Sequence, residues 1–99
     1  MIIECTADGD VRLTEPSDFR KFKVLLKGNA DIGSLVKTGI IVIDAGNALV
    51  PIALVPALPG RSNEDGWAGA YADMVRKARD YGWIDDKTDA IRAHIEREA

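Results

Sequence analysis

The sequence has few residues that could build disulfides or metal sites, since its 99 residues include one cysteine, Cys5, and one histidine, His94. A single cysteine excludes a disulfide within the chain, and the first residues lack the pattern of a secretory leader, so we expect a cytoplasmic protein. Two such ligands cannot complete a zinc site. A calcium loop over residues 85–96 is excluded, because Lys87 and Ala90 stand where it needs an oxygen ligand and a glycine. We expect no metal and no other cofactor.

An excess of positive charge is also lacking. The chain has 13 Lys and Arg against 16 Asp and Glu, a formal net charge of −3, whereas a nucleic-acid-binding protein needs a basic face to neutralise phosphates. The longest weakly charged stretch, residues 39–60, contains Asp44 as its single charge, but prolines and Gly46 interrupt it. A membrane-spanning helix needs about 20 predominantly apolar residues without such breaks. We therefore expect neither a nucleic acid nor a membrane as partner.

Aromatic residues are scarce in the first 62 residues, which contain two phenylalanines. The other four aromatics lie within seventeen residues of one another; they are Trp67, Tyr71, Tyr81 and Trp83. Tryptophan and tyrosine combine rigid apolar area with one polar group, so Trp67, Tyr71 and Trp83 are candidate ligand-binding residues. Alternatively they dock a helix onto the rest of the protein, because Trp67 and Tyr71 belong to an apolar helical stripe that must face something.

Alternation of apolar and polar residues over 3–14, with an Asp-Gly turn signal, predicts a β-hairpin. A two-residue loop would pair Glu4 with Leu13 and place the apolar side chains on opposite faces. A three-residue loop over residues 8–10 pairs Cys5 with Leu13 and gathers these side chains on one face. Because burial of one face specifies the register, we expect the three-residue loop.

The chain after this hairpin predicts a helical turn at residues 16–20, a strand at 21–27 and a short helix from residue 32. The apolar spacing before residue 27 fits a helix as well as a strand. Asp31 is suited to cap the short helix at its start, and Gly39 is suited to end it.

A second hairpin is predicted over residues 40–54, around a Gly-Asn turn at residues 46–47. Pairing outward from that turn sets Asp44 opposite Leu49 on a face of mixed character. The opposite face is wholly apolar and is expected to be core; it comprises Ile41, Ile43, Val50, Ile52 and Leu54. The mixed face still carries apolar side chains that two short helices cannot cover. We expect a second copy of the chain to cover them, which predicts a homodimer.

The last third of the chain predicts two helices. Apolar residues recur at helical spacing over residues 67–78, and Gly82 is placed to end that helix. A second helix is expected to begin at Asp85 or Asp86, with its isoleucines turned inward.

The expected fold is a single α+β domain over residues 1–99, strand-rich in residues 1–58 and helical in residues 63–98. An antiparallel sheet built from the N-terminal two-thirds carries a C-terminal helix pair packed on one face.

Two residues, Asp44 and His94, are candidates for acid–base catalysis. Asp44 ends an apolar strand, where loss of contact with water raises the pKa of a carboxyl group; its alternative role is to accept hydrogen bonds from the turn backbone. His94, the only histidine, would serve as a general acid or base, but no partner for it is visible in the sequence, and it also fits a residue flanking a packed stripe.

These patterns predict a small intracellular accessory or binding protein that self-associates, with a protein or a small-molecule ligand as a further partner. The alternative is a small metal-independent enzyme that uses acid–base residues on a small organic substrate. A pocket shared by Asp44, Trp67 and Tyr71 would favour the enzyme. A flat apolar surface crossed by a symmetry axis would favour the binding protein.

Overall fold

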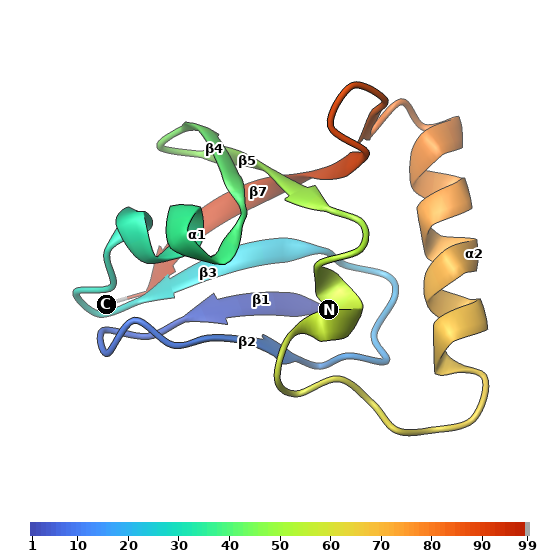
Figure 1. Cartoon of the computed structure of the whole chain (residues 1–99), viewed down its shortest axis with the longest axis horizontal. Helices are drawn as coiled ribbons and strands as arrows, with labels where there is room; N and C mark the ends of the chain where they lie inside the picture. The colour runs from blue at the N-terminus through green and yellow to red at the C-terminus, as the bar shows by residue number, and fades with distance from the viewer. Residues whose placement is uncertain (99) are drawn as a thin grey trace.

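The computed structural model describes residues 1–98, which form a seven-stranded sheet, two α-helices and one 3₁₀ helix (Figure 1). The strands are β1 (Ile2–Cys5), β2 (Val11–Thr14), β3 (Lys23–Lys27), β4 (Ile41–Asp44), β5 (Asn47–Pro51), β6 (Ile84–Asp85) and β7 (Ala90–Glu98). The helices are α1 (Ile32–Thr38), the 3₁₀ helix η1 (Val55–Ala57) and α2 (Trp67–Asp80).

The sheet is mixed, so the expected antiparallel sheet is wrong, although the chain is α+β. The strand order is β2-β1-β3-β7-β5-β4, and the short strand β6 pairs with β7 beside this path. β3 runs parallel to both β1 and β7, whereas the other pairs are antiparallel. The three central strands β1, β3 and β7 are parallel because each enters the sheet from the same end, although β7 is far from the other two in the sequence.

The expected C-terminal helix pair is also wrong, because the residues assigned to its second helix form β7. Ile91 and Ile95 are four residues apart, a spacing that fits a helix. Burial instead alternates: Ile91, Ala93 and Ile95 are buried, while Arg92 and His94 are exposed. β7 pairs with β3 on one side and with β5 on the other, so distant partners override the local helical preference. The region predicted to be helical therefore contains one α-helix and two strands.

The first hairpin has the expected faces but not the expected pairs. Cys5 pairs with Val11 rather than with Leu13, and the loop comprises residues 7–9 in place of 8–10. The pairing is shifted by two residues, and an even shift preserves the face on which every side chain lies. Cys5 and Leu13 are therefore both buried in the core, as predicted, although they are not partners.

The second hairpin differs from its predicted register by an odd number of residues. Leu49 pairs with Ile41 rather than with Asp44, and a β-bulge precedes Asp44. An odd shift moves the side chains of one strand to the other face, so Ile41 and Ile43 are 40% and 49% exposed instead of forming core. Val50 on β5 is buried, as predicted.

The segment between the hairpins largely follows its sequence pattern. The Oδ1 of Asp31 accepts a hydrogen bond from the Gly33 N–H (3.0 Å) and caps α1. Gly39 ends the helix with a φ of 111°, a left-handed conformation that glycine adopts without strain. β3 agrees with the strand predicted at 21–27, whereas residues 16–20 form turns rather than a helix.

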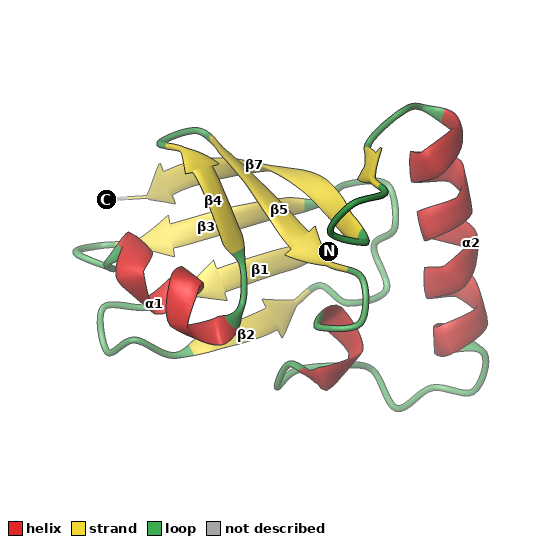
Figure 2. Cartoon of the chain, turned by 45° about the horizontal axis from the view of Figure 1, so that its top comes forward, coloured by secondary structure: helices red, strands yellow, loops and turns green. Residues whose placement is uncertain are grey.

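The core lies between one face of the sheet and the segments that cover it. Figures 1 and 2 show α1 and η1 over this face, and Leu35 of α1 and Val55 of η1 are wholly buried in the same cluster as Val24 and Ile91 of the sheet. The opposite face carries exposed side chains, including that of His94. α2 covers neither face, because it stands beside the end of the sheet at which β1 and β3 begin (Figure 1).

Two aromatic residues attach α2 to the rest of the molecule. The Nε1–H of Trp67 donates to the Pro16 carbonyl (2.7 Å), and the O–H of Tyr71 donates to the Ile52 carbonyl (2.8 Å). The two rings stack with their centroids 5.3 Å apart, and both side chains are buried. α2 is thereby fixed to the segments that follow β2 and β5. Over residues 1–98, no helix has both the length and the apolar character needed to cross a membrane.

Candidate functional site

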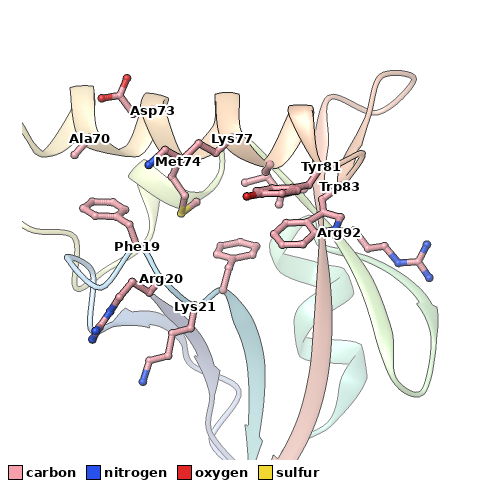
Figure 3. Close-up of a pocket in the computed structure, with 13 residues that line it drawn as sticks. Phe19, Arg20, Lys21, Ala70, Asp73, Met74, Lys77, Tyr81, Trp83 and Arg92 are labelled. Atoms are coloured by element: carbon pink, nitrogen blue, oxygen red, sulfur yellow. The ribbon is translucent and has the colours of Figure 1, made fainter.

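A cavity of about 560 Å³ lies between α2, the residues that precede β3 and the start of β7. Figure 3 shows α2 along one side of it, with Met74 projecting from the helix toward a facing wall that includes Phe19. Tyr81 and Trp83, which follow α2, close one end. We call this space the α2 cavity.

The interior of the α2 cavity is mainly apolar. Its aliphatic and phenylalanine lining residues are Phe19, Phe22, Ala70, Met74, Ala78 and Ile91. The apolar stripe of α2 thus has two uses: Trp67 and Tyr71 dock its N-terminal half, and Met74 and Ala78 line the cavity along its C-terminal half. Ala78 is too small to fill the gap that Tyr71 and Trp67 fill about two and three turns earlier, so this end of the stripe leaves space for a ligand.

The end of α2 places two aromatic rings at the mouth of the cavity. Gly82 has a φ of 80°, and the Trp83 N–H donates to the Ala78 carbonyl (2.9 Å), which are features of a Schellman motif. The sharp turn stacks Tyr81 on Trp83, with ring centroids 5.1 Å apart. These side chains are 70% and 54% exposed. Adjacent exposed aromatics on a soluble protein mark a binding surface more often than isolated ones do.

Positive charge dominates the rim of the α2 cavity. Its charged lining residues are Arg20, Lys21, Lys77, Arg92 and one acid, Asp73. The acid is paired with Arg76 on α2, and Arg20 and Lys21 are paired with carboxylates of the preceding loop. Among residues 1–98, Lys77 and Arg92 form no ion pair, and Figure 3 shows Lys77 extending along α2. The rim therefore offers two unpaired cations in a chain whose net charge is −3.

A second, smaller hollow of about 240 Å³ lies next to the α2 cavity. Trp83 and Arg92 line both spaces, and the smaller one also has Ile43, Leu49 and Ile84 in its walls. Apolar surface therefore continues from the α2 cavity across Trp83 to β4.

The three predicted ligand-binding residues occupy different environments. Trp83 lines the α2 cavity, but Trp67 and Tyr71 do not. Burial raises the pKa of the Tyr71 phenol, which keeps it in the neutral form that donates to the Ile52 carbonyl. Arg61 lies over the ring of Trp67, with its guanidinium carbon 5.1 Å from the ring centroid. The surroundings of Trp67 and Tyr71 are those of docking residues, the alternative that the sequence left open.

The acid–base candidates lie on the exposed face of the sheet. The carboxylate of Asp44 accepts hydrogen bonds from the Gly46 N–H (2.8 Å) and from Nδ2 of Asn47 (3.0 Å), and these lower its pKa rather than raise it. The side chain of His94 is 66% exposed, with Nε2 3.9 Å from a carboxylate oxygen of Glu96. Asp44 and His94 are both register partners of Asn47, so they share one row across three strands. Neither lines the α2 cavity or the smaller hollow.

The soft and acidic side chains form no metal site in the part of the chain that the structure describes. No three His, Cys, Asp or Glu residues of this part are grouped so that they could hold a metal ion. Cys5 is wholly buried, and burial raises the pKa of its thiol. A thiol in such surroundings is unreactive, because the nucleophilic form is the thiolate.

Sequence reasoning missed most of the α2 cavity. Tyr81 was visible in the aromatic cluster, and Met74 was visible in the apolar stripe of the helix, but both also fit ordinary packing. Lys77 carried no signal because a cation in the last turns of a helix is ordinary, and Arg92 carried none because its position at the cavity depends on where β7 enters the sheet. Comparisons of this chain with models of protein families, with curated proteins and with solved structures found no match.

Proposed function

We propose that this chain is a binding protein whose ligand is a small organic anion with a flat apolar body, held in the α2 cavity. The observation that carries the proposal is the combination in one cavity of about 560 Å³ of an apolar interior, an exposed aromatic pair and the unpaired cations Lys77 and Arg92. Cavities of roughly 300–1,000 Å³ accommodate small-molecule ligands. An apolar body would lie against Met74 and Trp83, with its anionic group toward the rim.

Approximate energies support a ligand of moderate affinity. A body the size of naphthalene that buries about 150 Å² of apolar area gains about 4 kcal/mol, at about 25 cal/mol per Å². A hydrogen bond to a charged group adds about 1.5–3 kcal/mol. Loss of translational and rotational freedom offsets part of this gross gain of about 5.5–7 kcal/mol, so we expect a Kd between about 0.1 and 1 mM.

The test uses two probes of nearly equal shape, 2-naphthoate and the uncharged 2-naphthamide, followed by NMR of the isotope-labelled protein. We expect naphthoate to bind at least fivefold more tightly. The largest shifts should fall on the Trp83 indole N–H, the Met74 methyl group and the Tyr81 ring, whereas the Trp67 indole N–H should shift little because it is buried against Pro16. Equal affinity for the two probes, or shifts centred elsewhere, would contradict the proposal.

Matched substitutions separate the site from general electrostatics. Lys77→Gln removes an unpaired cation of the rim and should weaken naphthoate binding several-fold, without changing naphthamide binding. Lys37→Gln removes the same charge from α1, away from the α2 cavity, and should leave both affinities unchanged. If the two variants weaken naphthoate binding equally, the anion is attracted by overall charge and not held at this rim.

The alternative, a metal-independent enzyme that uses Asp44 and His94, has weaker support. It rests on the shared row of these residues beside Asn47, but the carboxylate of Asp44 is occupied by its own turn, and neither residue lines the α2 cavity or the smaller hollow. A cytoplasmic location is part of the proposal; it is supported by the scarcity of cysteine, since Cys5 is the single cysteine of the chain and cannot form a disulfide within it.

A further inference from the structure

The two edges of the sheet differ in how their backbone is protected. At the β2 edge, the Leu13 N–H donates to the Pro59 carbonyl (2.7 Å), and the chain at Gly60 passes so close that a Cβ there would overlap the Leu13 carbonyl oxygen. At the β4 edge, no residue of Ile41–Asp44 has a backbone hydrogen bond to any strand other than β5 within residues 1–98. The backbone groups of β4 that point away from β5 are therefore open to another strand.

The side chains of β4 do not protect this edge. Natural edge strands are commonly blunted by lysine, proline or inward-pointing charge. β4 has the sequence Ile-Val-Ile-Asp, and Ile41 and Ile43 are exposed on the same face as Leu49, which pairs with Ile41. The bulge at Ile43, between Val42 and Asp44, is the one irregularity of this edge. An open backbone and exposed isoleucines together form a surface suited to strand addition.

We propose that β4 pairs with β4 of a second copy of this chain, antiparallel and about a two-fold axis at Val42. This register places Ile41 of one copy opposite Ile43 of the other, so that the exposed isoleucines of both copies meet on one face. A register shifted by one residue would set Val42, whose side chain points toward the core face, opposite Ile43 on the outer face. Because partners in an antiparallel pair must share a face, the one-residue shift is disfavoured.

Charge supports a second copy as the occupant. Asp44 is the only charged residue between residues 39 and 60, so the joined strands bring no like charges together. In the proposed register the two Asp44 residues lie at opposite ends of the joint, each facing Ile40 of the other copy. The α1 terminus that leads to Ile40 carries Lys37, which has no ion pair among residues 1–98. A two-fold interface therefore places Asp44 of each copy near the end of α1 that carries Lys37 in the other copy.

The mass in solution tests the interface. Sedimentation at about 50 μM should give the mass of two chains, and Ile43→Lys should give the mass of one, while its circular dichroism spectrum stays that of the parent. Tyr81→Lys adds the same charge at a more exposed position that is not part of β4 and should remain dimeric. A parent protein that is monomeric at this concentration, or an Ile43→Lys variant that remains dimeric, would overturn the proposal.

Disulfide trapping tests the register. In the proposed pairing the two Val42 Cα atoms lie about 4.5–5.5 Å apart, within the span of a disulfide. Val42→Cys should therefore form a covalent dimer on mild oxidation, since Cys5 is wholly buried and does not compete. Asp44→Cys is the control, because its two copies would be separated by four residues of strand, about 13 Å, and should not cross-link. Efficient cross-linking at position 44 and not at 42 would show that the strands pair differently.

Discussion

Replacing Tyr71 by phenylalanine tests whether α2 is held by docking contacts or instead presents its aromatics to a ligand. The substitution removes one partly buried hydrogen bond, from the phenol to the Ile52 carbonyl at 2.8 Å, and leaves the ring and its stacking on Trp67 in place. A hydrogen bond of this kind has a net value of about 0.5–1.5 kcal/mol, and a buried acceptor left without a partner costs about 1–3 kcal/mol. Because Ile52 is half-buried, we expect a loss of about 1–2 kcal/mol.

Urea unfolding monitored by circular dichroism measures this loss. For a chain of about 100 residues, each kcal/mol corresponds to a fall in Tm of about 4–8 °C. Tyr81→Phe is the matched control, because it deletes the same hydroxyl group from a side chain that is 70% exposed. A change at an exposed position away from special contacts stays within about 0.5 kcal/mol.

The comparison of these two variants can refute the docking role of Tyr71. If Tyr71→Phe and Tyr81→Phe have equal and small effects, the hydrogen bond to Ile52 does not hold α2, and Tyr71 becomes available again as a ligand-binding residue. If Tyr71→Phe is destabilised and still binds 2-naphthoate with the parent affinity, docking and binding are carried by different halves of the helix.

Further predictions concern the first hairpin, two glycines, pH and metals. Leu13→Ala should lower the free energy of unfolding by about 2–4 kcal/mol because Leu13 is buried, and Arg12→Ala should lower it by less than about 0.5 kcal/mol because Arg12 is exposed. Equal losses in urea unfolding would contradict this assignment of the hairpin faces. Gly60→Ala should be strongly destabilising, because φ is 94° and the new Cβ would overlap the Leu13 carbonyl, whereas Gly69→Ala on α2 meets no atom within 4 Å and should raise stability by about 0.5–1 kcal/mol. The raised pKa of Tyr71 means that the folded chain keeps a proton that the unfolded chain loses above about pH 10, so stability should fall as pH rises past that value, and less so in Tyr71→Phe. EDTA should leave the Tm unchanged; a fall of several degrees that zinc restores would show a metal site.

Elements that depend on neighbouring residues agree with their sequence patterns. α1 has the cap at Asp31 and the end at Gly39 that its sequence predicts. The stripe that begins at Trp67 forms α2. In each case the chemistry that selects the structure, a capping carboxylate, a left-handed glycine or an apolar spacing, lies within a few residues of the element that it selects.

Elements that depend on partners far away in the sequence differ from the structure that their sequence patterns predict. β7 has isoleucines at positions 91 and 95 that fit two periods equally, and its place between β3 and β5 decides between them. The register of β4 was misjudged because the loop was placed one residue too late and the bulge before Asp44 leaves no mark in the sequence. Because of that error, Ile41 and Ile43 were expected on the core face, whereas both are exposed. The homodimer expected from the mixed face of residues 40–55 stays a prediction, but the side chains proposed to form its interface are now Ile41 and Ile43.

The α2 cavity shows why a site of this kind escapes sequence analysis while remaining open to experiment. Its walls come from residues 19–22, from α2 and from β7, which the fold alone brings together. Because Trp67 and Tyr71 hold the helix while Lys77 and Trp83 border the cavity, stability and binding depend on different residues. A ligand that binds the folded state alone stabilises it by RT ln(1 + [L]/Kd). Naphthoate should therefore raise the Tm of Tyr71→Phe as it does that of the parent, and should raise that of Lys77→Gln less.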